Sequence, residues 1–87
     1  MSKLNFFSGP AVLPASVMQQ AADAIHNFDN TGLSILEISH RSKQFVKVMD
    51  EARALVKELM GLNANYEVLF LHGGALSQFH MVPMNLL

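Results

Sequence analysis

The segment from Tyr66 to Ala75 constrains this chain more than any other, because an apolar run leads directly into two glycines. Its residues read Tyr-Glu-Val-Leu-Phe-Leu-His-Gly-Gly-Ala. A short run that is apolar on both faces is typical of a strand inside a parallel sheet. The sequence offers no second convincing strand, and a lone buried strand would leave its backbone donors and acceptors unpaired. We therefore predict the opening part of a larger protein.

The composition permits one small domain or part of one. Of the 87 residues, 51% are hydrophobic, and a chain of this size buries about 60% of the surface that its unfolded form exposes. The formal net charge of -1, with 15% charged residues, provides neither a basic stripe for nucleic acid nor a polybasic segment for a membrane. We expect neither partner. Because Met81–Leu87 is almost wholly apolar, unlike a usual polar terminus, we expect the chain to be cut there.

Cysteine is absent, which excludes disulfides, zinc–thiolate sites and cysteine nucleophiles from these residues. The first residues lack the long apolar run of a secretory signal, and no apolar run is long enough to cross a bilayer. We therefore expect a cytoplasmic protein. The histidines have no recognised metal-ligand spacing, so we expect no metal site; they are His26, His40, His72 and His80.

Helical periodicity follows Pro14, which suits the first turn of a helix. Apolar residues recur on one face from Val17 to Phe28, and we predict that the helix ends in the polar run 29–32. Residues 33–38 alternate weakly and are predicted to be irregular.

A second helix is predicted after Ser42, whose hydroxyl can cap it. Its apolar stripe runs from Phe45 to Met60, and Gly61 is placed to end it in a left-handed conformation. A third helix is expected after the two glycines. No repeat, low-complexity tract or linker indicates a domain boundary within the chain.

Gly73 and Gly74 allow the backbone to approach an anion, while the following helix supplies free amide donors and the positive end of its dipole. A phosphate would suit this position, although a plain turn is the commoner role of such a pair. No Lys-Ser or Lys-Thr follows the glycines, and a third glycine is missing. These features exclude the nucleotide P-loop and the dinucleotide fingerprint.

His40 and Arg41 stand side by side just before the second predicted helix. A guanidinium offers a fork of donors to a carboxylate or phosphate, and an imidazole adds a donor near neutral pH. The alternative is a solvated pair in a loop. Ser8, in the run Ser8–Ala11, could also touch a substrate, with a capped turn as the alternative.

Three separated motifs resemble the N-terminal segment of the phosphoserine aminotransferase family, in the class V group of pyridoxal-phosphate enzymes. The motifs are Asn5–Ala11 with Leu13 and Pro14, Glu37–Lys43, and Asn65–Gly74 with Gln78, Phe79 and Val82–Leu86. The resemblance covers essentially the whole chain. It implies an α/β fold of the aspartate-aminotransferase type (fold type I), represented here by mostly helices and one sheet strand. Residues 1–87 would hold the N-terminal arm and small-domain helices, then the start of the large cofactor-binding domain near residue 66, with no complete independent domain.

The resemblance also implies an activity. The family forms homodimers that move an amino group from glutamate to 3-phosphohydroxypyruvate, which gives O-phosphoserine and 2-oxoglutarate in serine biosynthesis. A related substrate serves vitamin B6 (pyridoxine) synthesis in some bacteria.

By position, the resemblance implies that Gly74 and the amides of Ala75 and Leu76 bind the phosphate of pyridoxal 5'-phosphate. Many relatives have a third glycine where Ala75 stands and a polar or basic residue at Leu76, so only the backbone contacts carry over. Ser8, His40 and Arg41 would bind the substrate, with the histidine and arginine meeting its phosphate across the dimer interface.

The family's Schiff-base lysine matches none of the lysines present, which are Lys3, Lys43, Lys47 and Lys57. The resemblance therefore implies no catalytic residue in this segment, which is predicted to be inactive alone. Two alternatives remain open: a small stand-alone phosphate-binding module, and a helical fragment that supplies only an interaction surface.

Overall fold

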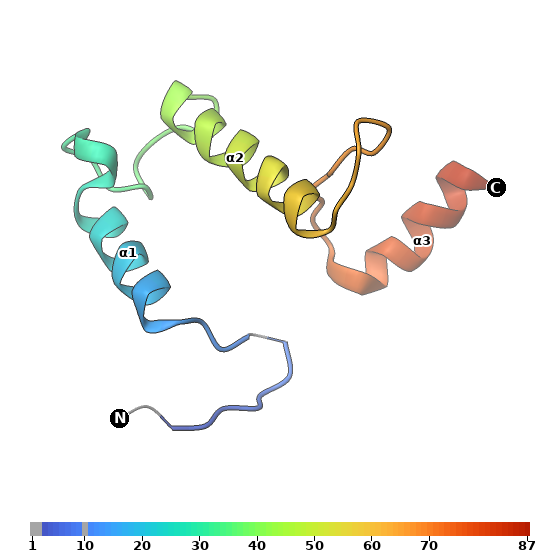
Figure 1. Cartoon of the computed structure of the whole chain (residues 1–87), viewed down its shortest axis with the longest axis horizontal. Coiled ribbons are helices and arrows are strands. Elements are labelled where there is room, and N and C mark those ends of the chain that lie inside the picture. The colour runs from blue at the N-terminus through green and yellow to red at the C-terminus, as the bar shows by residue number, and fades with distance from the viewer. Residues whose placement is uncertain (1–2, 10) are drawn as a thin grey trace. The chain divides into compact units, whose positions relative to one another are not determined.

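The computed structural model describes residues 3–9 and 11–87, and its regular elements are helices. These are α1 (Ala15–His26), the short 3-10 helix η1 (Phe28–Asn30), α2 (Lys43–Leu59) and α3 (Gly74–Leu86), as Figure 1 shows. The chain forms two compact units, 1–46 and 47–87, and the boundary falls inside α2. Within the described residues, no helix is both long and apolar enough to cross a membrane.

Helix α1 begins where the sequence predicts. The carbonyl of Pro14 accepts the N–H groups of Val17 at 3.0 Å and Met18 at 3.2 Å, and its φ of -56° already suits a helix start. The helix ends at His26, so Phe28 lies in η1 rather than on the predicted stripe. The reason is local, because Asn27, directly after His26, has the extended angles φ -159° and ψ 96° and does not continue a right-handed helix.

Helix α2 has both predicted ends. Ser42 Oγ accepts the N–H of Phe45 at 3.3 Å, which satisfies one of the free donors of the first turn. At the other end Gly61 has a φ of 66°. The N–H of Gly61 donates to the carbonyl of Glu58 at 3.1 Å, and the N–H of Leu62 donates to the carbonyl of Lys57 at 2.9 Å. This pair of bonds is the Schellman arrangement that closes helices at a left-handed glycine.

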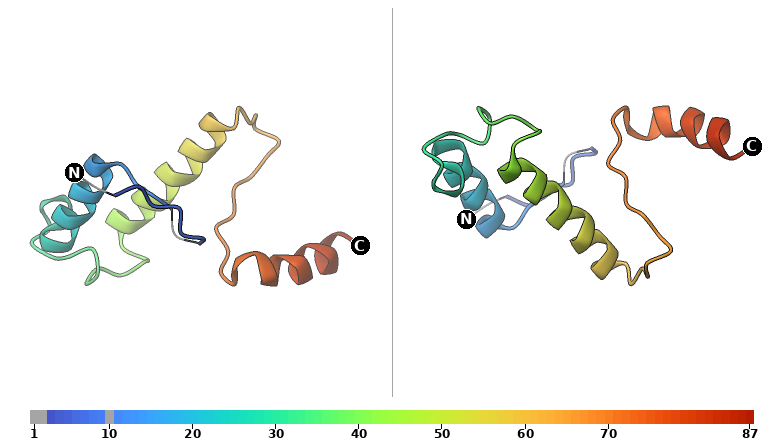
Figure 2. Two further views of the ribbon diagram at one scale, coloured as in Figure 1. Left: turned by 90° about the horizontal axis from the view of Figure 1, so that it is seen from below. Right: turned by 90° about the horizontal axis from the view of Figure 1, so that it is seen from above.

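The strand predicted over Tyr66–Leu71 is wrong. This segment has no regular structure, and no strand occurs in residues 3–9 or 11–87. A strand exists only through hydrogen bonds to a neighbouring strand, and the described chain offers none. The segment crosses from α2 to α3 as an open connection, orange in Figures 1 and 2. Leu69 is 72% exposed there.

Almost no side chain of the described residues is buried. Among the described residues Ser34 alone is buried, at 7% exposure, and no apolar side chain is. Large apolar side chains lie open on every long helix, including Met18 on α1, Leu59 on α2 and Phe79 on α3.

Candidate anion-binding site

The glycine turn before α3 has a conformation that favours glycine at both positions. Gly73 has a φ of 95° and Gly74 a φ of 61°, both in the left-handed region. A Cβ on Gly73 would also collide with the Ser77 hydroxyl, whereas one on Gly74 would meet open space. Position 73 therefore favours glycine for two reasons: its left-handed backbone conformation and the lack of space beside Ser77.

This turn leaves three amide donors free. Gly74, Ala75 and Leu76 form the first turn of α3, where N–H groups have no acceptor within the helix. In the described structure none of the three makes a hydrogen bond, whereas the next amide, that of Ser77, donates to the carbonyl of Gly73 at 3.3 Å. The amides gather at the positive end of the α3 dipole, so the turn can bind an anion.

A hollow lies beside the turn. It is lined by Gly74, by Gln78 one helical turn later, and by three apolar residues of the preceding segment, Leu69, Phe70 and Leu71. Gln78 carries a neutral side-chain amide and lines the same hollow as Gly74. The sequence does not mark Gln78 as a site residue, although its spacing of four from Gly74 places both on one helical face.

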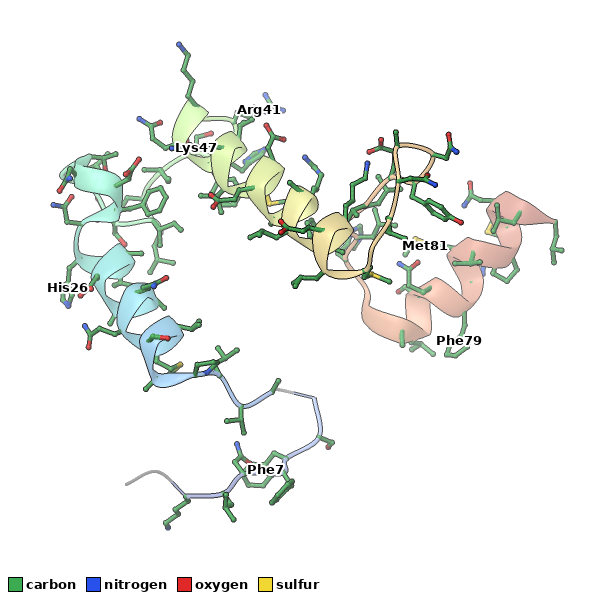
Figure 3. The ribbon with its side chains drawn as sticks, in the orientation of Figure 1. Phe7, His26, Arg41, Lys47, Phe79 and Met81 are labelled. Atoms are coloured by element: carbon green, nitrogen blue, oxygen red, sulfur yellow. The ribbon has the colours of Figure 1, made fainter. Side chains whose placement is uncertain are left out.

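His40 and Arg41 are the two central residues of a turn that leads into α2. The carbonyl of Ser39 accepts the N–H of Ser42 at 3.0 Å, and Ser39 Oγ accepts the N–H of Arg41 at 3.1 Å. Both His40 and Arg41 are exposed. Figure 3 places Arg41 beside the first turn of α2.

Residues 31–38, the connector between η1 and this turn, are extensively hydrogen-bonded. Residues 33–38 within it are irregular, as the sequence predicts. Thr31 Oγ1 donates to the carbonyl of Phe28 at 2.6 Å and accepts the N–H of Leu33 at 3.2 Å. Asn27 Oδ1 accepts the N–H of Gly32 at 2.8 Å. These short polar side chains hold the connector in place of a helix or sheet ladder.

The connector is also tied back to α1. The N–H of Ile35 donates to the carbonyl of Ala24 at 2.9 Å. Just before it, buried Ser34 accepts the N–H of Leu36 on its Oγ at 3.1 Å. The path from α1 to His40 and Arg41 is thus held by both backbone and side-chain bonds.

Ser8 lies exposed in an arm without regular structure, where Asn5 Oδ1 accepts the N–H of Phe7 at 3.0 Å. Pro10, part of the motif around Ser8, lies outside the described residues. In the described part of the chain no hydrogen bond joins Ser8 to His40 or Arg41. The structure therefore brings together the His40–Arg41 pair and, separately, the Gly74–Leu76 amides.

No group of three or more metal-ligating side chains occurs in residues 3–9 and 11–87.

The lysines of α2 differ in exposure, because Lys43 and Lys47 are exposed and Lys57 is half-buried. Lys57 is only 27% exposed at its side chain, and its Nζ lies 3.8 Å from Glu67 Oε1. The salt bridge links the last turn of α2 to the segment before the glycine turn.

The sequence as a whole decides the family. The model of the family described as aminotransferase class-V matches residues 4–87. The chain belongs to the class-V aminotransferase family. The predicted resemblance is thereby confirmed over nearly the whole chain.

Curated class-V relatives match over the full chain. The phosphoserine aminotransferase of Parabacteroides distasonis is 58% identical over 87 residues, all of this chain and 24% of the relative. The phosphoserine aminotransferase of Flavobacterium johnsoniae is 56% identical over 88 residues, again all of this chain and 25% of the relative. The chain thus spans about a quarter of the length of the curated relatives it matches.

Solved structures agree with the class-V assignment. Phosphoserine aminotransferase from Bacillus circulans subsp. alkalophilus matches with a TM-score of 0.84 and 44% identity, over 92% of this chain and 22% of that one. A structure described as radiation damage of the Schiff base in phosphoserine aminotransferase matches with a TM-score of 0.84 and 42% identity. The match covers 90% of this chain and 22% of that one. The predicted fold family is confirmed, whereas its one predicted strand is not formed here.

Proposed function

We propose that the protein carrying this chain is a phosphoserine aminotransferase, which transfers an amino group from glutamate to 3-phosphohydroxypyruvate and so forms O-phosphoserine and 2-oxoglutarate. The observation that carries the proposal is the 58% identity, over all 87 residues, with a relative of that name. The chain would be the N-terminal quarter of a longer enzyme. Its pathway would be L-serine biosynthesis, with a related substrate of pyridoxine synthesis as a second use.

Pyridoxal 5'-phosphate would be the cofactor, and the glycine turn fits its phosphate. Two observations support the fit: three N–H donors lack an acceptor at the start of α3, and Gly73 has no room for a side chain beside Ser77. When bound, the cofactor supplies the electron-withdrawing ring that allows an amino group to be exchanged. Gly74, Ala75 and Leu76 would donate their N–H groups to its phosphate.

Arg41 and His40 would bind the anionic substrate. The Arg41 guanidinium can donate two parallel hydrogen bonds to a carboxylate or phosphate, and its exposure leaves it available. Ser8 would line the same site from the arm. We propose that the complete enzyme is a homodimer in which His40 and Arg41 reach the substrate's phosphate across the interface.

This segment would contribute binding groups rather than catalytic ones. The lysine that bonds the cofactor in the family has no counterpart among the lysines of this chain. The proposal therefore assigns proton transfer and cofactor attachment to residues outside positions 1–87, and residues 1–87 alone would be inactive.

We propose the same organisation that the resemblance implies, in which the arm and first helices belong to a small domain and the large cofactor-binding domain starts near residue 66. The absence of a buried apolar side chain in the described residues supports the view that they form no complete independent domain. The same observation argues against a stand-alone binding module. We place the enzyme in the cytoplasm.

The test is a transamination assay with the purified full-length protein. Pyridoxal phosphate, glutamate and 3-phosphohydroxypyruvate are supplied, and 2-oxoglutarate is measured against a parallel reaction with unphosphorylated hydroxypyruvate. We expect turnover that depends on the cofactor and strongly favours the phosphorylated acceptor. Saturable phosphate binding without any transamination would instead support the binding-module alternative.

A further inference from the structure

Arg41 owes its backbone position to one neighbouring side chain. We propose that Ser39 is a positioning residue for Arg41: its hydroxyl oxygen sets the backbone from which the guanidinium reaches the anionic substrate. The inference rests on the proposed function, because it assigns Ser39 a task only if Arg41 binds substrate.

Two hydrogen bonds from one residue close the turn. Ser39 Oγ accepts the N–H of Arg41 at 3.1 Å, and the Ser39 carbonyl accepts the N–H of Ser42 at 3.0 Å. The amides on both sides of the Arg41 α-carbon are thus bound to Ser39. Ser42 in turn caps α2 through the N–H of Phe45 at 3.3 Å. Arg41 therefore stands between a closed turn and a capped helix.

Local bonds matter at this position because little else holds it. Ser39, His40 and Arg41 are all exposed, so no packing within the described residues sets the backbone angles there. An arginine side chain is long, and a small backbone rotation moves its guanidinium away from the geometry that paired hydrogen bonds require. Removing the Ser39 hydroxyl should therefore weaken substrate binding without removing any group that touches the substrate.

The chain contains a matched control in Ser34, which makes the same two bonds. Ser34 Oγ accepts the N–H of Leu36 at 3.1 Å, and its carbonyl accepts the N–H of Glu37 at 2.9 Å. Ser34 differs in being buried, at 7% exposure. Its hydroxyl should contribute to stability, and the amide that it binds belongs to Leu36 rather than to the proposed substrate-binding arginine.

The experiment compares Ser39→Ala, Ser39→Thr and Ser34→Ala in the full-length enzyme. We expect Ser39→Ala to raise the KM for the phosphorylated substrate by about two- to tenfold, the range set by one hydrogen bond, with kcat and the KM for cofactor nearly unchanged. Ser39→Thr keeps the acceptor oxygen and should restore the KM. Ser34→Ala should lower the melting temperature and leave the KM unchanged.

Crystal structures of the same variants give a readout that does not depend on activity. The turn 39–42 should shift or lose order in Ser39→Ala and persist in Ser39→Thr. An unchanged turn and an unchanged KM in Ser39→Ala would overturn the inference, as would an equal rise in KM for Ser34→Ala. A wild-type enzyme that transaminates no phosphorylated substrate would overturn the proposed function instead, while the variant structures would still report on Ser39.

Discussion

Two stretches without regular structure, residues 31–42 and 66–71, differ in what holds them. In the first, hydroxyls of Thr31, Ser34 and Ser39 each accept a backbone N–H two residues further along. In the second, residues 67–71 take part in no hydrogen bond of the described structure, and Glu67 alone makes a polar contact, with Lys57 at 3.8 Å. Short polar side chains specify a shape locally, whereas an apolar stretch specifies only a need for neighbours.

The largest effect is expected where the apolar stretch meets the glycine turn. Gly73→Ala would impose a left-handed alanine, at a cost of about 1–3 kcal/mol, and would also force the Ser77 hydroxyl to move. If the turn distorts to accept the new side chain, we expect cofactor affinity to fall on the order of 100-fold. If the turn keeps its shape, we expect the protein to lose stability instead. Fluorescence titration of the full-length protein with pyridoxal phosphate measures the cofactor affinity, and urea unfolding measures the stability.

The control for this change is Gly74→Ala. Its φ is also left-handed, but a Cβ there meets open space, so we expect only the backbone cost of about 1–2 kcal/mol. Equal effects of the two substitutions would show that the Ser77 contact contributes nothing.

The second prediction concerns the hydrogen-bonded connector, whose proposed purpose is to present Arg41. Arg41→Ala should raise the KM for the phosphorylated substrate by about ten- to 100-fold, because it removes a charge-assisted contact, and should affect cofactor binding much less. Arg53→Ala is the matched control, since Arg53 lies on α2 and pairs with Asp50 at 3.2 Å. Steady-state kinetics on both variants decide it, and an unchanged KM in Arg41→Ala would contradict the role.

The third prediction tests whether hydroxyls really hold the connector. Thr31→Val keeps the shape of the side chain but removes the hydroxyl that donates to the carbonyl of Phe28 and accepts the N–H of Leu33. The Phe28 carbonyl keeps its bond from the backbone N–H of Thr31 at 2.9 Å, so the N–H of Leu33 is the group that loses its partner. We expect the full-length protein to lose about 0.5–1.5 kcal/mol of unfolding free energy, the net contribution of an ordinary hydrogen bond, measured by urea denaturation. Thr31→Ser retains the hydroxyl and should recover most of it; equal losses in both variants would assign the effect to the methyl group instead.

The smallest effect is expected at the polar contact of the apolar stretch. Lys57→Met removes the salt bridge to Glu67, which is 79% exposed at its side chain. An exposed pair of this kind contributes about 0.5 kcal/mol or less, and salt should screen even that. Melting temperatures at low and high ionic strength check it. A loss comparable to that of Thr31→Val would mean that the two stretches are held alike.

The sequence by itself determined the features that depend on near neighbours. Pro14 before α1, the Ser42 cap and the left-handed Gly61 all lie where the residues predict, because each satisfies backbone groups within a few positions. The irregular connector was predicted too. The sequence did not predict which hydrogen bonds form inside it, because a Ser or Thr hydroxyl can bond to any of several nearby backbone groups.

The predicted sites divide in the same way. The glycine turn and the His40–Arg41 turn are each continuous in sequence, so their residues could be named in advance. Gln78 and Ser39 belong to the motifs of the resemblance, but the lining of the hollow by Gln78 and the bond from the Arg41 N–H to Ser39 Oγ are seen only in the structure.

What the tertiary structure alone decided is the state of Tyr66–Leu71. Its apolar pattern predicts a strand, yet strand formation depends on hydrogen bonds to residues distant in the sequence, and the described chain supplies no partner. Caps and turns form from bonds within a few residues, whereas a sheet forms only between segments. That is why the helices and the glycine turn could be predicted from these residues, whereas the state of Tyr66–Leu71 could not.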